Sequence, residues 1–275
     1  MDMKMAQTIL ITGASTGIGK ATAKYFQAQG WNVVATMRKP EDGAELAAFD
    51  NVLVTRLDVT EPASIEAAVA VTLDKFGQVD VLLNNAGYGA YGPLENFDMD
   101  RIRRQFDTNV IGLLEVTKAV LPQMRARKAG TIVNISSIGG QITFPLGTLY
   151  HGTKFAVEGI SEALHYELET IGVKVRIVEP GMIATDFSGR SFDFANDPAI
   201  GEYQGVVSAV MGSFANQAFP PSPPEVVAEV IWTAVTDGSN TLRYRAGQDA
   251  DYLLTNRKAA DDATFIGGIK EQMGL

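Results

Sequence analysis

The chain has 275 residues, of which 46% are hydrophobic and 20% charged, and its formal net charge is −9. This composition is typical of a globular protein with a large core, and the lack of a basic excess argues against nucleic-acid binding. The absence of cysteine excludes disulfides, thiolate catalysis and cysteine-ligated zinc, and two histidines are too few to favour a multi-histidine metal site, so we expect no metal.

Short β-branched runs alternate with helical patterns along the chain. The predicted strands are Thr8–Gly13, Asn32–Arg38, Val52–Val59, Val79–Gly87, Thr131–Ser137, Val173–Pro180 and Thr241–Gly247. The predicted helices are Ile18–Gln29, Pro62–Phe76, Asp100–Arg127, Leu149–Thr170 and Pro224–Val235. Several strands are apolar on both faces, as in a parallel sheet covered on each side. The sequence therefore predicts an α/β fold with a doubly wound, parallel, seven-stranded sheet and helices on both faces.

Residues 182–223 interrupt this alternation, because they show no clean period. The segment is rich in large apolar side chains, namely Phe187, Phe192, Phe194, Tyr203, Met211, Phe214 and Phe219. A long irregular segment in a compact domain is often a lid or a binding loop. We therefore expect a single domain over residues 1–275, with a substrate-binding loop or lid at 182–223 and a C-terminal extension at 248–275.

A glycine-rich stretch, "TGASTGIGK", follows the first predicted strand and opens the first helix. Gly13, Gly17 and Gly19 would let the backbone approach a pyrophosphate, and a helix N-terminus supplies free N–H groups and a partial positive charge. Any tight strand-to-helix turn also uses glycine. The position of this glycine-rich stretch after the first predicted strand favours a dinucleotide site.

The end of the second strand bears on which nucleotide would bind. A carboxylate that binds the adenosine ribose is expected about 20 residues beyond the glycines. The sequence there is "ATMRKP", with Met37 in place of the acid and Arg38 and Lys39 next. A guanidinium suits a 2′-phosphate, which favours NADPH over NADH. The alternative is a basic surface turn.

A tyrosine and a lysine stand four residues apart in "YHGTK", at Tyr150 and Lys154. Residues at this spacing share a helix face, and a nearby cation stabilises a phenolate. One interpretation is a partly exposed tyrosine beside a surface lysine. The other is a proton donor whose acidity the lysine adjusts.

Six motifs occur in the order found in short-chain dehydrogenases/reductases, which the chain resembles over about residues 7–186. They are "TGASTGIG", "NNAG" (84–87), "TNVIG" (108–112), "ISS" (135–137), "YHGTK" and "PGMIAT" (180–185). The resemblance implies a Rossmann-type fold. It also implies an enzyme that acts on CH–OH or C=O groups with NADP(H) and a small substrate.

The resemblance assigns catalytic roles to four residues. Tyr150 would donate the proton to the carbonyl oxygen, or accept it in the oxidative direction. Lys154 would hold the nicotinamide ribose and lower the pKa of the phenol, and Ser137 would hydrogen-bond the substrate oxygen. Asn109 would help to hold a water chain that reaches the lysine. Neighbours on a strand face opposite sides, so Ser136 is expected to make structural bonds.

The resemblance also implies a set of cofactor-binding residues. It comprises Gly13, Ser15, Thr16, Gly17, Ile18, Gly19, Arg38, Asp58, Val59, Asn85, Ala86, Gly87, Tyr150, Lys154, Pro180, Gly181, Ile183 and Thr185. Asp58 and Val59 would lie against the adenine. Asn84 is expected to brace the sheet, and the family pattern does not need His151 or His165 in catalysis.

The leading hypothesis is an NADPH-dependent carbonyl reductase for an apolar ketone or aldehyde. The segments expected near the substrate, 88–97, 141–149 and 182–223, are aromatic or aliphatic and poor in basic residues. One alternative is an NAD-linked alcohol or hydroxysteroid dehydrogenase working oxidatively, against which Arg38 argues. Another is a non-catalytic NADPH-binding sensor, against which the complete catalytic set argues.

Assembly and location are further expectations. The family pattern implies a homodimer or homotetramer, whereas the extension at 248–275 could cover or change such an interface. The N-terminal sequence lacks a signal peptide pattern, and no window resembles a membrane helix of about 18 apolar residues. We therefore expect a cytoplasmic protein with neither membrane nor nucleic acid as a partner.

Overall fold

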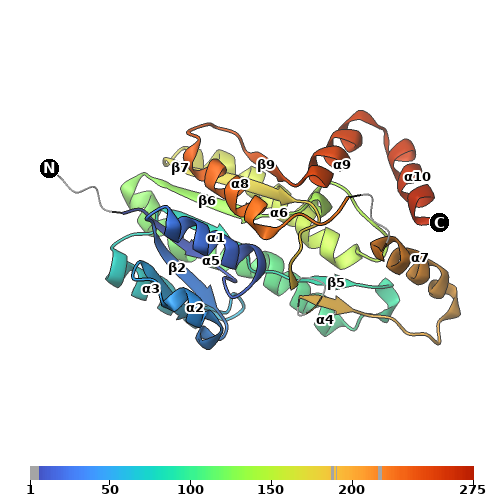
Figure 1. The fold of residues 1–275 in the computed structure, drawn as a ribbon, viewed down its shortest axis with the longest axis horizontal. Coiled ribbons are helices and arrows are strands. Elements are labelled where there is room, and N and C mark those ends of the chain that lie inside the picture. Colours follow the sequence, from blue (N-terminus) through green and yellow to red (C-terminus); the bar gives the residue numbers. More distant parts are fainter. Residues whose placement is uncertain (1–5, 187–188, 190, 216–218) are drawn as a thin grey trace.

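The computed structural model describes residues 6–186, 189, 191–215 and 219–275. At its centre lies one parallel sheet with the strand order β3-β2-β1-β4-β6-β7-β9 (Figure 1). Its strands are β1 (Thr8–Ile11), β2 (Asn32–Met37), β3 (Val52–Arg56), β4 (Val81–Asn84), β6 (Gly130–Ile135), β7 (Val173–Pro180) and β9 (Arg243–Ala246). The predicted doubly wound, seven-stranded sheet is therefore confirmed.

Helices cover both faces of this sheet (Figure 1). The helices of the described residues are α1 (Gly17–Ala28), α2 (Ala44–Ala47), α3 (Pro62–Phe76), α4 (Met99–Phe106), α5 (Gly112–Arg127), α6 (Thr148–Glu169), α7 (Gln204–Ala215), α8 (Pro224–Thr236), α9 (Gln248–Ala259) and α10 (Asp262–Met273). Of these, α1 and α8 pack on one face of the sheet and α3 and α5 on the other. No helix in the described ranges is long and apolar enough to cross a membrane.

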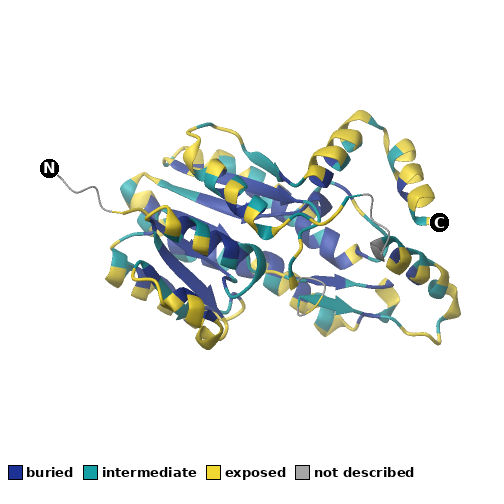
Figure 2. Cartoon of the chain, viewed as in Figure 1, coloured by how far each residue is buried: buried dark blue, intermediate teal, exposed yellow. Residues whose placement is uncertain are grey.

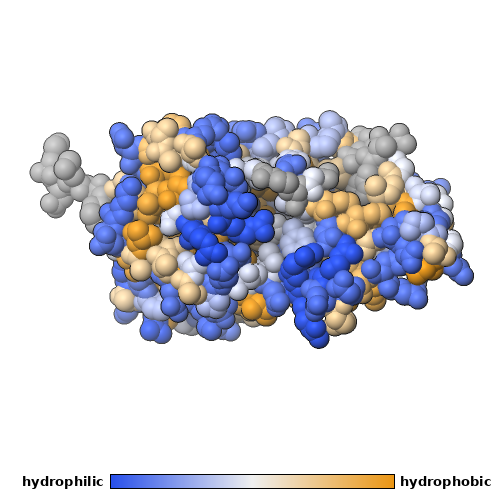
Figure 3. Space-filling view, turned by 90° about the horizontal axis from the view of Figure 1, so that it is seen from below, coloured by the Kyte–Doolittle hydropathy of each residue, from blue (hydrophilic) through white to orange (hydrophobic). Residues whose placement is uncertain are grey.

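The core consists of two hydrophobic layers, one on each side of the sheet. Ile9 and Ile11 of β1 pack in the layer beneath α1 and α8, whereas Leu10 between them packs in the layer beneath α3 and α5. Because successive residues of a strand face opposite sides, a strand covered on both faces is apolar at every position. The central strands are accordingly buried, and the exposed residues lie mainly on the outer helix faces and loops (Figure 2). Seen from below, hydrophobic side chains gather in separate patches towards either end (Figure 3).

One helix predicted as continuous is interrupted. In place of a single helix over 100–127, α4 is followed by a π-helical turn, η3 (Asp107–Ile111), and then by α5. π-helical turns inside α-helices occur frequently at functional sites, and this one carries Asn109.

The segment 182–223 is more regular than its sequence suggested. Strand β8 (Phe192–Phe194) pairs in parallel with β5 (Gly89–Tyr91), and α7 follows. Phe187 lies outside the described residues, as does the side chain of Phe214. The C-terminal extension forms α9 and α10, which pack over the turn at Ile138–Gly140 and against α7 (Figure 1).

Candidate active site

The candidate site lies where four neighbouring strands end. Parallel strands present their carboxyl ends at one edge, and a doubly wound sheet binds ligands there. The chain leaves β1 towards Gly13, β4 towards Asn85, β6 towards Ser137 and β7 towards Gly181. The sheet order places β1, β4, β6 and β7 side by side, so segments far apart in the sequence meet at one edge of the sheet.

The glycine turn has the close backbone packing that a phosphate site requires. Gly13 and Gly17 have φ values of 69° and 54°, which side chains disfavour. A Cβ atom at Gly19 would collide with the carbonyl oxygen of Gly13. Helix α1 begins here without an acidic residue in its first turn, so its free N–H groups meet no competing carboxylate. This cradle fits a dinucleotide phosphate.

The predicted adenosine side lies next to the turn. Arg38 is exposed immediately after β2, whereas Met37 is 3% exposed and belongs to the core. The Asp58 carboxylate accepts hydrogen bonds from the Thr60 backbone N–H (2.9 Å) and hydroxyl (2.7 Å), which shape the turn after β3. Val59 packs closely against Gly112 at the start of α5. Arg38 therefore presents its guanidinium to solvent, where a phosphate could reach it.

One buried residue at this site, Thr12, was not predicted from the sequence. The Thr12 hydroxyl accepts hydrogen bonds from the backbone N–H groups of Asn85 and Ala86, each at 3.0 Å, and fastens the loop after β4 to β1. The Asn85 amide in turn donates to the carbonyl oxygens of Thr12 (2.9 Å) and Gly13 (3.0 Å). The available signal was a threonine directly after the aliphatic run 9–11.

The three central catalytic candidates come together in the core. Tyr150 and Lys154 lie on α6, each 9% exposed, and Ser137 follows β6 at 8% exposed. The Ser137 hydroxyl interacts with the Tyr150 phenol, and its oxygen also accepts from the Gly139 N–H at 3.0 Å. The Lys154 ammonium lies 5.8 Å from the centre of the Tyr150 ring. The alternative of an exposed tyrosine beside a surface lysine is therefore wrong.

Burial dominates the protonation of this cluster. It raises the pKa of Tyr150 above its ordinary value of 10.0, and the hydrogen bond with Ser137 opposes the rise. Burial and the Ser137 hydrogen bond account for this shift, so a lowering of the phenol pKa by Lys154 stays a prediction. Burial also lowers the pKa of Lys154 from 10.5 to about 8, against the attraction of Glu158. The Lys154 ammonium donates to the Ile135 carbonyl oxygen at 2.9 Å.

Asn109 connects the π-helical turn to both neighbouring segments. Its amide donates to the Tyr88 carbonyl oxygen (2.9 Å) and to the Thr153 hydroxyl oxygen (3.1 Å), and its own oxygen accepts from the Tyr88 N–H (3.1 Å). The Thr153 hydroxyl donates to the Tyr150 carbonyl oxygen at 2.7 Å. Asn109 therefore positions the helical turn that carries Tyr150, and its role in a water chain stays a prediction.

His151 has a structural role beside the tyrosine. Its Nδ1 lies 3.0 Å from the Gly139 carbonyl oxygen, and its Nε2 accepts from the Phe144 N–H at 3.0 Å. A neutral ring protonated at Nδ1 satisfies both bonds. Burial lowers the pKa of His151, which favours that neutral form. The ring thus braces the loop over 139–144.

The segment after β7 is fastened by the C-terminal extension. The carboxylate of Asp249, 7% exposed at the start of α9, accepts a 2.6 Å hydrogen bond from the Met182 N–H. A Cβ atom at Gly181 would collide with this carboxylate. Further on, Ile183 forms a bridge with Ser222, and the Thr185 side chain lies against Gly17. The sequence reasoning missed Asp249 because it lies in a separate helix.

These features combine a doubly wound fold with a buried cluster of Ser137, Tyr150 and Lys154, an arrangement of the kind found in dinucleotide-dependent oxidoreductases. Residues 7–195 match the family model of the short chain dehydrogenases, and the chain belongs to this family.

Relatives that align with most of the chain support this assignment to the family. An uncharacterised oxidoreductase of Schizosaccharomyces pombe is 46% identical over 242 residues, which are 87% of this chain and 100% of that protein. Retinol dehydrogenase 8 of Bos taurus is 34% identical over 257 residues, 87% of this chain and 81% of that protein. The crystal structure of a short-chain dehydrogenase from Streptomyces avermitilis superposes with a TM-score of 0.83 at 35% identity, covering 100% of both chains.

Proposed function

We propose that the protein is an NADPH-dependent carbonyl reductase that converts an apolar ketone or aldehyde to an alcohol. The observation that carries this proposal is the buried cluster in which the Tyr150 phenol interacts with Ser137 and the Lys154 ammonium lies over the Tyr150 ring. When bound, the nicotinamide cofactor supplies the hydride. The glycine turn would hold its pyrophosphate, Arg38 the 2′-phosphate and Lys154 the nicotinamide ribose.

The protein's own residues then manage the substrate oxygen. The Ser137 hydroxyl donates a hydrogen bond to the carbonyl oxygen and orients it towards the phenol. As negative charge develops on that oxygen, the Tyr150 O–H bond breaks and a new O–H bond forms on the product alcohol. Ser137 and the Lys154 ammonium stabilise the phenolate that remains. Solvent returns the proton to Tyr150 after the alcohol has formed.

The residues at the end of β2 support NADPH over NADH. Met37 stands where a ribose-binding acid is expected, and the exposed guanidinium of Arg38 suits a 2′-phosphate. These residues therefore disfavour an NAD-linked dehydrogenase. The complete cluster disfavours a sensor without activity.

Aromatic side chains beside the phenol support an apolar substrate. The ring of Tyr91 lies 5.3 Å from that of Tyr150, and Phe192 stacks on Tyr91 at 5.4 Å. Similarity to retinol dehydrogenase 8, whose name specifies an apolar alcohol, agrees with this choice.

Steady-state kinetics with both nucleotides test the proposal. A panel of aryl ketones, alicyclic ketones and aliphatic aldehydes is assayed with NADPH and with NADH for the wild type and Arg38→Asp. We expect turnover with NADPH, and a preference that moves towards NADH in the variant because the carboxylate repels the 2′-phosphate. Lys174→Asp is the control, since Lys174 is exposed on β7. Equal use of both nucleotides by wild type and variant would contradict the assignment of Arg38.

A further inference from the structure

A row of aromatic rings leads away from the proton donor. The ring centres of Tyr150 and Tyr91 are 5.3 Å apart, those of Tyr91 and Phe192 5.4 Å, and those of Phe192 and Phe194 5.9 Å. The last two pairs are stacked, with interplanar angles of 29° and 7°. Tyr91, Phe192 and Phe194 are half-buried, and the ring of Tyr91 lies beside that of the proton donor Tyr150.

Strand pairing places these rings on one face. In the parallel pair β5–β8, Ala90 lies opposite Asp193 and Tyr91 opposite Phe194. Because side chains alternate along a strand, Tyr91, Phe192 and Phe194 share one face, while Ala90 and Asp193 share the other. This small sheet therefore separates an aromatic face from a charged face.

The charged face fixes the sheet to α4. The Asp193 carboxylate accepts hydrogen bonds from Nε (3.2 Å) and Nη2 of Arg101 and from Nη2 of Arg104 (2.8 Å). The two guanidinium groups also lie over the rings of Phe97 and Tyr88. The hydrogen bond with Arg101, followed by that with Arg104, keeps the pKa of Asp193 below its ordinary value. The carboxylate therefore stays charged at neutral pH and anchors β8.

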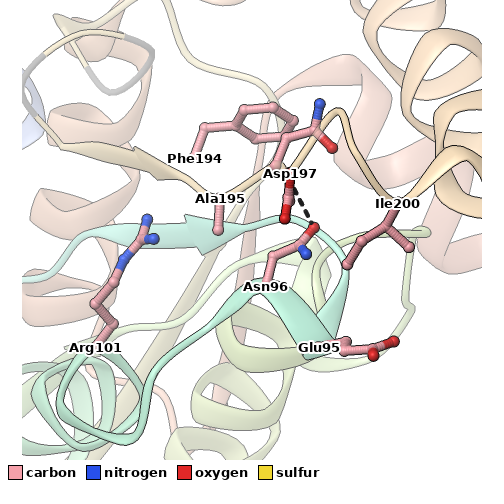
Figure 4. A pocket seen from close by; sticks show the side chains of 8 residues that line it. Glu95, Asn96, Arg101, Phe194, Ala195, Asp197 and Ile200 are labelled. Atoms are coloured by element: carbon pink, nitrogen blue, oxygen red, sulfur yellow. Dashed lines mark hydrogen bonds between the residues drawn. The ribbon is translucent and has the colours of Figure 1, made fainter.

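The far end of the aromatic row adjoins a cavity of about 430 Å³ (Figure 4). Phe194, Ala195 and Ile200 give it apolar surface, and the polar lining consists of Glu95, Asn96, Arg101, Asn196 and Asp197. Arg101 is already paired with Asp193, so the carboxylates of Glu95 and Asp197 dominate the electrostatics that a ligand meets. Such a lining favours a neutral hydrogen-bonding group over an anion.

We propose that Tyr91, Phe192 and Phe194 form the specificity-determining surface for a flat, extended carbonyl compound. The reacting carbonyl lies at Tyr150, the aromatic or conjugated body lies along the row, and a neutral polar end reaches the cavity beyond Phe194. Asp193 is a positioning residue that holds β8 in place. This inference rests on the proposed carbonyl reduction and adds the shape and far-end chemistry of the substrate.

Matched two-ring ketones provide the test. The ratio of kcat/KM for 2-acetylnaphthalene to that for its saturated decalin analogue is measured with NADPH for the wild type, Phe192→Leu and the control Phe49→Leu. Phe49, which is 37% exposed, lies in the turn before β3. Aromatic pairing should make the ratio fall by about two- to tenfold in Phe192→Leu, while intrinsic reactivity cancels. An unchanged ratio would overturn the proposal.

Two further measurements test the role of Asp193 and that of the cavity beside Phe194. In Asp193→Asn, the KM for 2-acetylnaphthalene should rise several-fold with a smaller change in kcat, because the reacting groups at Tyr150 are intact. A general loss of folding would instead lower kcat for every substrate. Among 4-acetyl-p-terphenyls substituted at the 4″ position, which are long enough to extend past Phe194, the hydroxyl compound should have the lower KM and the carboxylate the higher. A carboxylate that binds as well as the hydroxyl compound would contradict the role of Glu95 and Asp197.

Calorimetric binding of 2-acetylnaphthalene to the NADP⁺-saturated protein tests the aromatic surface separately from the proposed reaction. Absence of turnover on the whole panel, together with weaker binding of 2-acetylnaphthalene in Phe192→Leu than in Phe49→Leu, would reject the proposed reaction and support the surface. Turnover with no difference in binding between these variants would support the reaction and reject the surface.

Discussion

Replacement of Lys154 by Met should stabilise the fold while it abolishes activity. Burial lowers the pKa of Lys154 from 10.5 to about 8, which corresponds to about 3 kcal/mol of unfavourable charge burial at neutral pH. The methionine side chain has a similar volume and no charge. Loss of the hydrogen bond to the Ile135 carbonyl oxygen removes about 1–2 kcal/mol of this gain. The expected net effect at about pH 7 is a stabilisation of about 1–2 kcal/mol.

The pH dependence gives a sharper signature than the absolute value. Because the folded-state pKa lies below the unfolded one, the unfolded chain binds more protons between about pH 8 and pH 10.5. Wild-type stability should therefore rise with pH across this window, by about 2 kcal/mol between about pH 7 and pH 9.5. Lys154→Met lacks this contribution, so its advantage should shrink by the same amount at the higher pH.

Urea unfolding at both pH values, followed by tryptophan fluorescence, measures these differences. Trp31 and Trp232 pack against Phe26 in the core, so their emission reports global unfolding. Lys174→Met removes an exposed lysine and should leave the pH dependence of the wild type unchanged. If the difference between the wild type and Lys154→Met is the same at both pH values, the ammonium is not desolvated and the reasoning is refuted.

Three further substitutions test how the site is assembled. Thr12→Val removes the oxygen that joins two loops and should cost about 1–3 kcal/mol of unfolding free energy by urea titration, most of which Thr12→Ser should restore. Gly19→Ala places a Cβ atom against the Gly13 carbonyl and should weaken NADPH binding at least tenfold by calorimetry, whereas Gly159→Ala, in open space on α6, should not. Asp249→Ala removes the acceptor of the Met182 N–H and should raise the Kd for NADPH several-fold, and Asp249→Asn should raise it less. An unchanged Kd in both variants would contradict the role of Asp249.

The sequence was sufficient for the features that depend on local patterns. Doubly covered parallel strands are apolar throughout, and a residue pair four apart on a helix stays together, so the sheet and the pairing of Tyr150 with Lys154 were predictable. Features that depend on contacts between distant segments were not predictable from the sequence. The three-residue pairing of β5 with β8 joins segments about 100 residues apart, and Asp249 reaches the site from a separate helix. The raised phenol pKa follows from burial, which local spacing does not specify.

The central claim is that the buried phenol of Tyr150 donates the proton in carbonyl reduction. The most direct measurement is the rate of NADPH oxidation by a reducible ketone in the wild type, Tyr150→Phe and Tyr166→Phe, with NADPH affinity determined in parallel. Tyr166 lies on the same helix and is 65% exposed, so its variant controls for the loss of a hydroxyl group on α6. We expect turnover to disappear only in Tyr150→Phe while NADPH still binds. Turnover that survives in Tyr150→Phe would contradict the account.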